Sequence, residues 1–251
     1  MPTALITGAT AGIGAAFARK LAADGLTPVL VARDAARLKE SAAGLRRRYG
    51  VEPEVLAADL TTEDGLAAVE ERLHAGVDLL VNNAGFGHES RYEALDVPVA
   101  DEVRMLRLHC EAVLRLTMAA LPSIRARGRG GVINVASVAA FFPGGTYSAS
   151  KAWVVNYSQS MALSIPEPRV RVMALCPGFV RTEFHQRASI DISGIPSWLW
   201  LDADRVVATA MRDFARGALV SIPDPRYKAI ATVARFLSPG MVRRGRGRVG
   251  R

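Results

Sequence analysis

Short apolar runs alternate with longer amphipathic stretches along most of the chain. The apolar runs, rich in Val, Ile and Leu, predict strands at 4–7, 28–32, 54–58, 78–82, 131–137, 170–176 and 218–222. The stretches between them predict helices at 13–24, 34–48, 63–75, 98–126, 147–164 and 202–216. Strands that are apolar on both faces are typical of parallel sheets covered by helices on both sides. The alternation therefore predicts an α/β fold, a doubly wound parallel sheet of about seven strands.

Two of the predicted helices carry further signals. Asp34 stands where its side chain can cap the helix that follows the second strand. In the stretch 98–126, a repeat every three or four positions predicts a buried stripe made of Val103, Leu106, Cys110, Val113, Thr117 and Leu121. No tandem repeat or long linker divides the chain. We therefore expect a single domain over residues 1–240 and a basic, flexible tail at 241–251.

Composition excludes several classes of protein. Half of the 251 residues are hydrophobic and 22% are charged, which excludes a disordered or collagen-like chain. No uncharged apolar run approaches the ~18 residues of a membrane-spanning helix. The first residues, MPTALITG, lack the basic segment of a signal peptide. Cys110 and Cys176 are too few for a disulfide framework, so we expect a cytoplasmic protein with reduced thiols.

The net charge of +8 is confined to the C-terminal end of the chain. No acid follows Asp224, and the bases that follow it account for the whole net charge: Arg226, Lys228, Arg235, Arg243, Arg244, Arg246, Arg248 and Arg251. Such a tail could contact nucleic acid or anionic lipid. A solvated terminus is the simpler interpretation, and we expect neither contact.

A glycine-rich turn, Gly8-Ala9-Thr10-Ala11-Gly12-Ile13-Gly14, lies between the first predicted strand and the first predicted helix. Glycines at such a turn let a pyrophosphate approach the backbone at the helix N-terminus. The spacing is not GxGxxG, because Phe17 stands where the third glycine would fall. A tight turn without a ligand is therefore the alternative.

With Thr7, this turn matches the fingerprint TGxxxGxG, and the chain resembles the short-chain dehydrogenase/reductase family. Further motifs follow in the family's order: Asn82-Asn83-Ala84-Gly85, Ser137, Tyr147-Ser148-Ala149-Ser150-Lys151 as YxxxK, and Pro177-Gly178. YxxxK begins the predicted helix 147–164, and each of the others stands at the end of a predicted strand or just after it. The resemblance covers residues 3–222. It implies a Rossmann-like fold, a nicotinamide cofactor and oxidoreductase activity on CH–OH and C=O groups.

The YxxxK spacing has a physical basis of its own. Tyr147 and Lys151 are four residues apart, so a helix places them on one face. A nearby ammonium lowers a tyrosine pKa from its usual value near 10, which suits proton transfer near neutral pH. The resemblance implies that Lys151 also holds the nicotinamide ribose. Helix geometry turns Ser148 and Ser150 to other faces. A surface Tyr–Lys pair is the alternative.

The resemblance implies two more catalytic residues. Ser137 would hydrogen-bond the substrate oxygen and stabilise developing charge. The family's fourth catalytic residue is an asparagine that kinks the fourth helix and holds a water beside the lysine; His109 stands at the matching position. Its ring nitrogens could hold that water. Alternatively, the histidine could weaken the relay or face elsewhere. The loop 138–146, shorter than is usual in the family, borders the substrate pocket.

Two residues after the second strand point to different cofactors. Asp34 lies 20 positions after Gly14, and by simple count it would bind a ribose hydroxyl and select NAD. The resemblance favours Arg33, because NAD-preferring members carry an acid at the position of Ala32 and NADP-preferring ones often carry arginine next. We therefore expect NADP(H), with Arg33 pairing with the 2′-phosphate. The other expected cofactor contacts are Gly8, Thr10, Gly12, Ile13, Gly14, Asp59, Leu60, Asn83, Ala84, Gly85, Tyr147, Lys151, Pro177, Gly178, Val180 and Thr182.

The segment 179–201 is irregular and apolar, and in the family it forms the substrate lid. It predicts a hydrophobic ketone, aldehyde or secondary alcohol as substrate. A subunit interface or a membrane-facing patch is the alternative.

Family members commonly pair through the fourth and fifth helices, so we expect a homodimer or homotetramer. His74, His88 and His185 show no metal-ligand spacing, so we expect no metal site, although His88 could border the pocket.

We therefore predict an NADP(H)-dependent carbonyl reductase or alcohol dehydrogenase in which Tyr147 is the general acid/base. The alternative is a non-catalytic NADP-binding regulator or scaffold that retains the fold. The intact set of Ser137, Tyr147 and Lys151 argues against this alternative, and His109 in place of the asparagine argues mildly for it.

Overall fold

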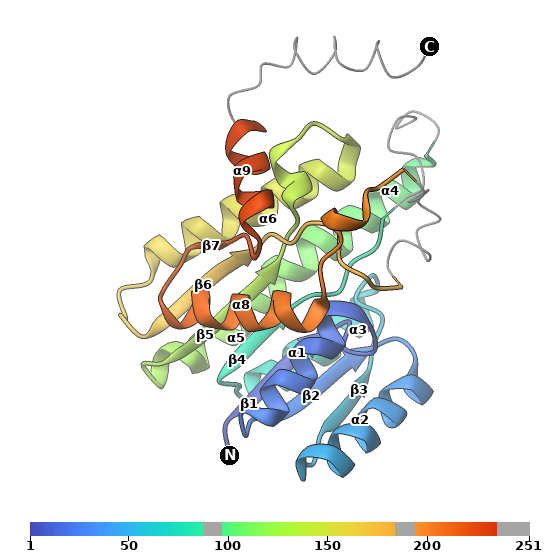
Figure 1. Cartoon of the computed structure of the whole chain (residues 1–251). Helices are drawn as coiled ribbons and strands as arrows, with labels where there is room; N and C mark the ends of the chain where they lie inside the picture. Colours follow the sequence, from blue (N-terminus) through green and yellow to red (C-terminus); the bar gives the residue numbers. More distant parts are fainter. Residues whose placement is uncertain (88–96, 184–193, 235–251) are drawn as a thin grey trace.

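One seven-stranded parallel sheet forms the centre of the protein (Figure 1). The computed structural model describes residues 1–87, 97–183 and 194–234. The strands are β1 (Thr3–Thr7), β2 (Thr27–Ala32), β3 (Glu54–Ala57), β4 (Leu79–Asn82), β5 (Gly130–Val135), β6 (Val170–Leu175) and β7 (Val220–Ser221). Their order across the sheet is β3-β2-β1-β4-β5-β6-β7, and each neighbouring pair is parallel. The predicted Rossmann-like, doubly wound sheet is confirmed.

Helices cover both faces of this sheet. One face carries α1 (Gly12–Ala23), α2 (Ala35–Tyr49) and α8 (Ala203–Ala215), and the other carries α3 (Glu63–His74), α5 (Ala112–Ala126) and α6 (Gly145–Ser164). Alternate strand residues serve the two layers: Ile6 packs under α1 and Leu5 on the opposite side. Asp34 caps α2 as predicted, because its Oδ1 accepts hydrogen bonds from the N–H groups of Ala36 and Arg37.

The fourth helical region differs from the prediction. A π-helical turn, Arg107–Glu111, joins α4 (Val99–Leu106) to α5. The predicted buried stripe is wrong before this turn, since Val103 is 49% and Leu106 is 42% exposed, whereas Met105 is buried. A π turn holds more residues than an α turn, so a repeat of three and four read across it mixes two helix faces. The later members of the stripe are buried as predicted: Val113, Thr117 and Leu121.

A helix that the sequence pattern did not predict, α9 (Pro225–Ala234), follows β7. It packs against the 3₁₀ turn η2 (Val138–Phe141), near the carboxyl end of the sheet (Figure 1). Among the described helices, none is long and apolar enough to cross a membrane. Part of the predicted lid (184–193), His88, His185 and the predicted tail at 241–251 lie outside the described residues.

Candidate active site

The predicted site residues gather at the carboxyl ends of the parallel strands. β1 and β4 are neighbours in the sheet, and the chain runs outward from them in opposite directions. Ligands of open α/β sheets bind in the crevice at such a switch point. Here the glycine turn follows β1 and Asn83 follows β4, so these two motifs meet at that crevice.

The glycine turn is packed too tightly for side chains. Gly8 has a φ of 66°, which favours glycine. A Cβ at Gly14 would lie 2.2 Å from the carbonyl oxygen of Gly8 and 2.5 Å from Asn83 Nδ2. Asn83 Nδ2 donates to the carbonyl oxygens of Thr7 at 2.9 Å and Gly8 at 3.2 Å. Thr7 Oγ1 accepts from the N–H groups of Asn83 and Ala84, each at 2.9 Å. These bonds hold the turn in a fixed position beside β4.

The described residues of this turn fit the pyrophosphate of a dinucleotide. Ala11 occupies the N-cap of α1 without a side-chain capping bond, and the first turn of the helix has no acidic residue. The positive end of the helix dipole and the first N–H groups can therefore bind an anion. A Cβ at Gly12 would lie 2.9 Å from Thr182 Cγ2, so Thr182 lies directly against the turn.

Arg33 and Asp59 follow the neighbouring strands β2 and β3. Asp59 Oδ1 accepts from the N–H and the hydroxyl of Thr61, at 2.9 and 2.7 Å. Burial acts to raise the pKa of Asp59, but the two bonds from Thr61, with the charges of Arg33 and Arg104, outweigh it and lower the pKa. Asp34, the alternative ribose ligand, uses Oδ1 to cap α2. Arg33 is exposed and available to a phosphate.

Tyr147 and Lys151 lie one turn apart on α6. Lys151 is 5% exposed, its Nζ donates to the carbonyl oxygen of Val135 at 3.0 Å, and the same atom lies 5.8 Å from the centre of the Tyr147 ring. Burial lowers the pKa of Lys151 to about 8, while Cys110 and Cys176 act in the opposite direction. Because the lysine is buried, the alternative of a surface Tyr–Lys pair is wrong.

Ser137 follows β5 and caps η2. Its Oγ accepts from the N–H of Ala139 at 3.1 Å, which leaves its own O–H to donate to a ligand. The next residue, Val138, donates its N–H to the carbonyl oxygen of Pro177 at 3.0 Å. The serine and the Pro177-Gly178 motif are therefore held side by side.

His109 is fully buried in the π turn and faces Tyr147, with ring centres 5.6 Å apart in an edge-on arrangement. Its Nε2 accepts from the N–H of Phe86 at 3.2 Å, and its Nδ1 lies 3.0 Å from Ser150 Oγ. Ser150 donates to the carbonyl oxygen of Tyr147 at 2.8 Å. We assign the proton to Nδ1, because that tautomer satisfies all three bonds. Both ring nitrogens thus have protein partners, which does not support the predicted water-holding role.

Ser150 is a site residue that sequence reasoning missed. Ser150 lies on a different face of α6 from Tyr147 and Lys151. It still belongs to the site, because His109 of the π turn contacts it there. A buried polar network lies further back and was also missed: Asn82 Nδ2 donates to Thr117 Oγ1 at 3.2 Å and to Asn134 Oδ1 at 2.9 Å. Asn134 in turn donates to Ser158 at 3.0 Å. No spacing signal in the sequence links these residues, because each comes from a different element.

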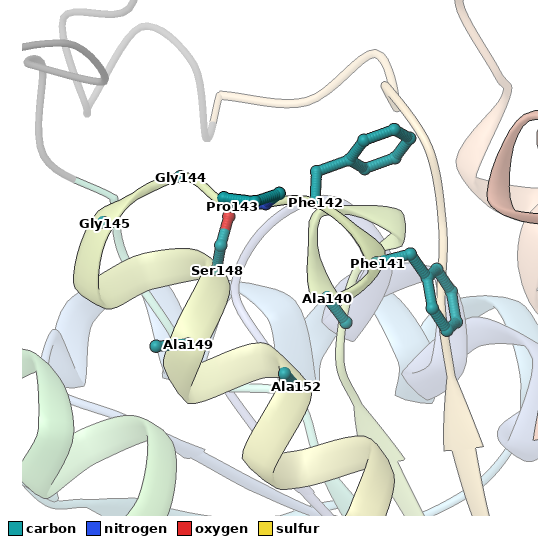
Figure 2. A pocket seen from close by; sticks show the side chains of 9 residues that line it. All are labelled: Ala140, Phe141, Phe142, Pro143, Gly144, Gly145, Ser148, Ala149 and Ala152. Atoms are coloured by element: carbon teal, nitrogen blue, oxygen red, sulfur yellow. The ribbon is translucent and has the colours of Figure 1, made fainter. Parts of the chain in front are cut away.

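A hollow of about 490 Å³ lies between the loop after η2 and the start of α6 (Figure 2). Small and aromatic residues line it: Ala140, Phe141, Phe142, Pro143, Gly144, Gly145, Ser148, Ala149 and Ala152. In Figure 2, Ser148 points toward Pro143. The catalytic candidates are not among the lining residues, so this hollow lies beside the Tyr147–Lys151 pair rather than at it.

The described ends of the predicted lid pair with each other. Val180 and Leu201 form a parallel bridge, with Leu201 N–H donating to the carbonyl oxygen of Phe179 at 2.8 Å. The rings of Phe179 and Trp200 lie 5.7 Å apart. The chain therefore leaves β6 and returns at the same place, beside Pro177-Gly178.

Comparison with known proteins identifies the family of this chain. The family model for short chain dehydrogenase matches residues 2–192. A very-long-chain 3-oxoacyl-CoA reductase of Anas platyrhynchos is 31% identical over 190 residues, which cover 72% of this chain and 60% of the relative. The chain thus spans about three fifths of the length of the first curated relatives that it matches.

Solved structures match over almost the whole chain. A short-chain dehydrogenase of Sphingobium yanoikuyae in complex with NADPH is 37% identical, with a TM-score of 0.85 and 93% of both chains covered. The bulky-bulky ketone specific alcohol dehydrogenase of Comamonas testosteroni is 32% identical, with a TM-score of 0.79 and coverage of 93% of this chain and 92% of its own. The chain therefore belongs to the short-chain dehydrogenase/reductase family of oxidoreductases.

Proposed function

We propose that this protein is an NADP(H)-dependent carbonyl reductase or alcohol dehydrogenase. The observation that carries the proposal is the buried Lys151 beside the Tyr147 ring on α6, bonded to Val135 two residues before Ser137. These groups lie at the edge of the sheet where the glycine turn fits a dinucleotide. When bound there, the nicotinamide supplies or accepts the hydride at its C4 atom.

The chain's own residues handle the proton and the oxygen. During reduction, Tyr147 gives its phenolic proton to the carbonyl oxygen, and Ser137 donates a hydrogen bond to the same oxygen. The ammonium of Lys151 stabilises the phenolate that remains and would bind the ribose hydroxyls. The bond from Ser150 holds the backbone of Tyr147 in place. During alcohol oxidation the same groups act in reverse.

Arg33 favours NADP(H) over NAD(H). Both cofactor preferences occur in the family, and the residue after β2 distinguishes them by its charge. An exposed guanidinium at this strand end can pair with a 2′-phosphate in a bidentate manner. The NADPH complex of the Sphingobium yanoikuyae relative supports the same choice.

We also propose a hydrophobic substrate and a closed oligomer. The described ends of the segment 179–201 present Phe179 and Trp200 near the site, and the relative from Comamonas testosteroni is specific for bulky-bulky ketones. On α5, Leu114 and Met118 are exposed large hydrophobic residues. Such a face suits pairing with a second copy.

A substrate panel with a single variant tests the proposal. Hydrophobic ketones and secondary alcohols are offered with NADPH or NADP⁺, and turnover is followed by the nicotinamide absorbance. Tyr147→Phe should keep NADPH binding and lower kcat by about 10²- to 10⁴-fold, because it removes only the proton donor. Tyr49→Phe, at the far end of α2, is the matched control and should leave kcat unchanged. Full turnover by Tyr147→Phe would contradict the mechanism, and NADPH binding without any turnover by the parent would favour a regulator or scaffold.

A further inference from the structure

The first turn of α9 contacts both described ends of the segment 179–201. Tyr227 is 3% exposed. Its hydroxyl accepts a hydrogen bond from the N–H of Phe179 at 3.1 Å and donates one to the carbonyl oxygen of Leu199 at 2.8 Å. One side chain therefore connects the stretch that leaves β6 with the stretch that returns.

The ring of Tyr227 also explains the glycine of the Pro177-Gly178 motif. A Cβ at Gly178 would lie 2.1 to 2.4 Å from three carbons of that ring. Any side chain at this position would displace the ring or the backbone. The two residues are thus matched in shape, although they belong to a strand end and to a later helix.

Arg226 adds a second contact from the same turn of α9. Its Nη1 donates to the carbonyl oxygen of Trp198, and its guanidinium lies 6.0 Å from the centre of the Trp198 ring. Asp224 pairs with Arg226 at 2.7 Å and accepts from its N–H at 2.9 Å, which orients the guanidinium.

The contacts of Tyr227 extend to the glycine turn through three short steps. Phe179 accepts from the N–H of Leu201, and Leu201 accepts from the N–H of Arg181 at 3.0 Å. The next residue, Thr182, lies against Gly12 at the N-terminus of α1. A shift of Phe179 would therefore move Thr182 relative to the cofactor turn.

We propose that Tyr227, supported by Arg226, is a positioning residue for the nicotinamide end of the cofactor site. It fixes Gly178 and Phe179, and through them Thr182. This inference rests on the proposed function and on the cofactor contacts expected at Pro177, Gly178, Val180 and Thr182.

Tyr227→Phe is the direct test, because it keeps the ring and removes only the hydroxyl. The dissociation constants of NADPH and NADH are measured by fluorescence titration, and thermal unfolding is followed in parallel. The N–H of Phe179 and the carbonyl oxygen of Leu199, both partly buried, lose their bond to the hydroxyl, so we expect both cofactors to bind about fivefold to tenfold more weakly, with the ratio of the two affinities unchanged. The ratio is the informative readout, because Arg33 at the opposite end should change it. Tyr49→Phe is the matched control and should alter neither affinity.

Affinities within twofold of the parent, accompanied by a lower Tm, would show a purely structural role and overturn the inference. If Tyr227→Phe does not fold, Arg226→Gln is measured instead: a twofold to fivefold loss for both cofactors supports the inference and an unchanged affinity overturns it. A parent that binds NADPH but turns over no ketone or alcohol contradicts the proposed function alone. A parent that binds neither cofactor contradicts both.

Discussion

The glycine turn after β1 and the catalytic end of α6, which carries Tyr147 and Lys151, depend on different kinds of contact. The turn comes from one short stretch, Gly8–Gly14, and its demands are on atom size and backbone angle. The catalytic end needs partners from other elements: a backbone carbonyl of β5 for Lys151, and a backbone N–H after β4 and the Ser150 hydroxyl for His109 of the π turn. A local motif thus supplies the first region, and Asn83 and Thr182 pack against it, whereas the second region depends on the register of helices far apart in sequence.

Gly14→Ala should break the turn and have the largest effect. The added Cβ would overlap the Gly8 carbonyl oxygen, so we expect NADPH binding to be lost and the free energy of unfolding to fall by ~1–3 kcal/mol. Urea denaturation and NADPH titration measure the two effects. Gly44→Ala in α2 is the control, since nothing lies within 4 Å of its Cβ; it should stabilise the protein by ~0.5–1 kcal/mol. Equal behaviour of the two variants would show that the turn is not sterically constrained.

Lys151→Met tests whether the Lys151 side chain is buried in the folded protein. In the folded protein burial lowers the pKa of Lys151 to about 8, whereas a free lysine titrates near ~10.4. Between these pH values the unfolded chain binds more protons, so the free energy of unfolding should rise with pH. Relative to Lys151→Met, the parent should gain up to ~3 kcal/mol from pH ~8 to ~10.4. The free energy of unfolding of both proteins is measured by urea denaturation at several pH values. If the difference between the two proteins does not change with pH, Lys151 is not buried as described.

Arg33→Ala should separate the two cofactors at the other end of the site. A lost charge-assisted bond costs ~1.5–3 kcal/mol, so NADPH should bind about 10- to 150-fold more weakly while NADH changes little. Titration with both cofactors gives the ratio. Arg46→Ala, which removes another exposed arginine in the last turn of α2, should leave that ratio unchanged. Equal losses of NADPH and NADH in Arg33→Ala would rule out 2′-phosphate recognition.

Variants of His109 test whether its contacts with Phe86 and Ser150 matter for catalysis. His109→Leu leaves the N–H of Phe86 without this partner, at ~1–3 kcal/mol, and removes the bond between the ring and Ser150 Oγ. It should lower kcat by more than about tenfold. His109→Asn should stay within about tenfold of the parent. If Ser150 acts through the histidine, Ser150→Ala should cost less in the His109→Asn background than in the parent. Parent-like activity of His109→Leu would place the residue outside the mechanism.

Met118→Glu should have the smallest effect on chemistry, because Met118 is not among the proposed cofactor-binding or catalytic residues. Met118 is 53% exposed, and a charge there should weaken a dimer or tetramer that buries it. Light scattering at micromolar concentration should then show a smaller species, with kcat nearly unchanged. A monomeric parent would contradict the proposed oligomer.

The regular layers were predictable because each is a local pattern. Apolar runs located all seven strands, and Asp34 marked the start of α2. The stripe prediction failed at Val103 and Leu106, since the helical repeat assumes 3.6 residues per turn and the π turn does not obey it. α9 was missed because its short sequence has no strong apolar period.

Three features could be read from the sequence: the order of the motifs along the chain, the need for small residues in the glycine turn, and the four-residue spacing of Tyr147 and Lys151. Each depends on backbone geometry and near neighbours. Which buried side chains and backbone groups contact one another depends on the tertiary structure. It placed His109 between Phe86 and Ser150, put Val135 beneath Lys151, and brought Tyr227 onto Gly178. These contacts join elements that lie far apart in sequence, and their distances depend on how helices pack on the sheet, which no short sequence pattern encodes.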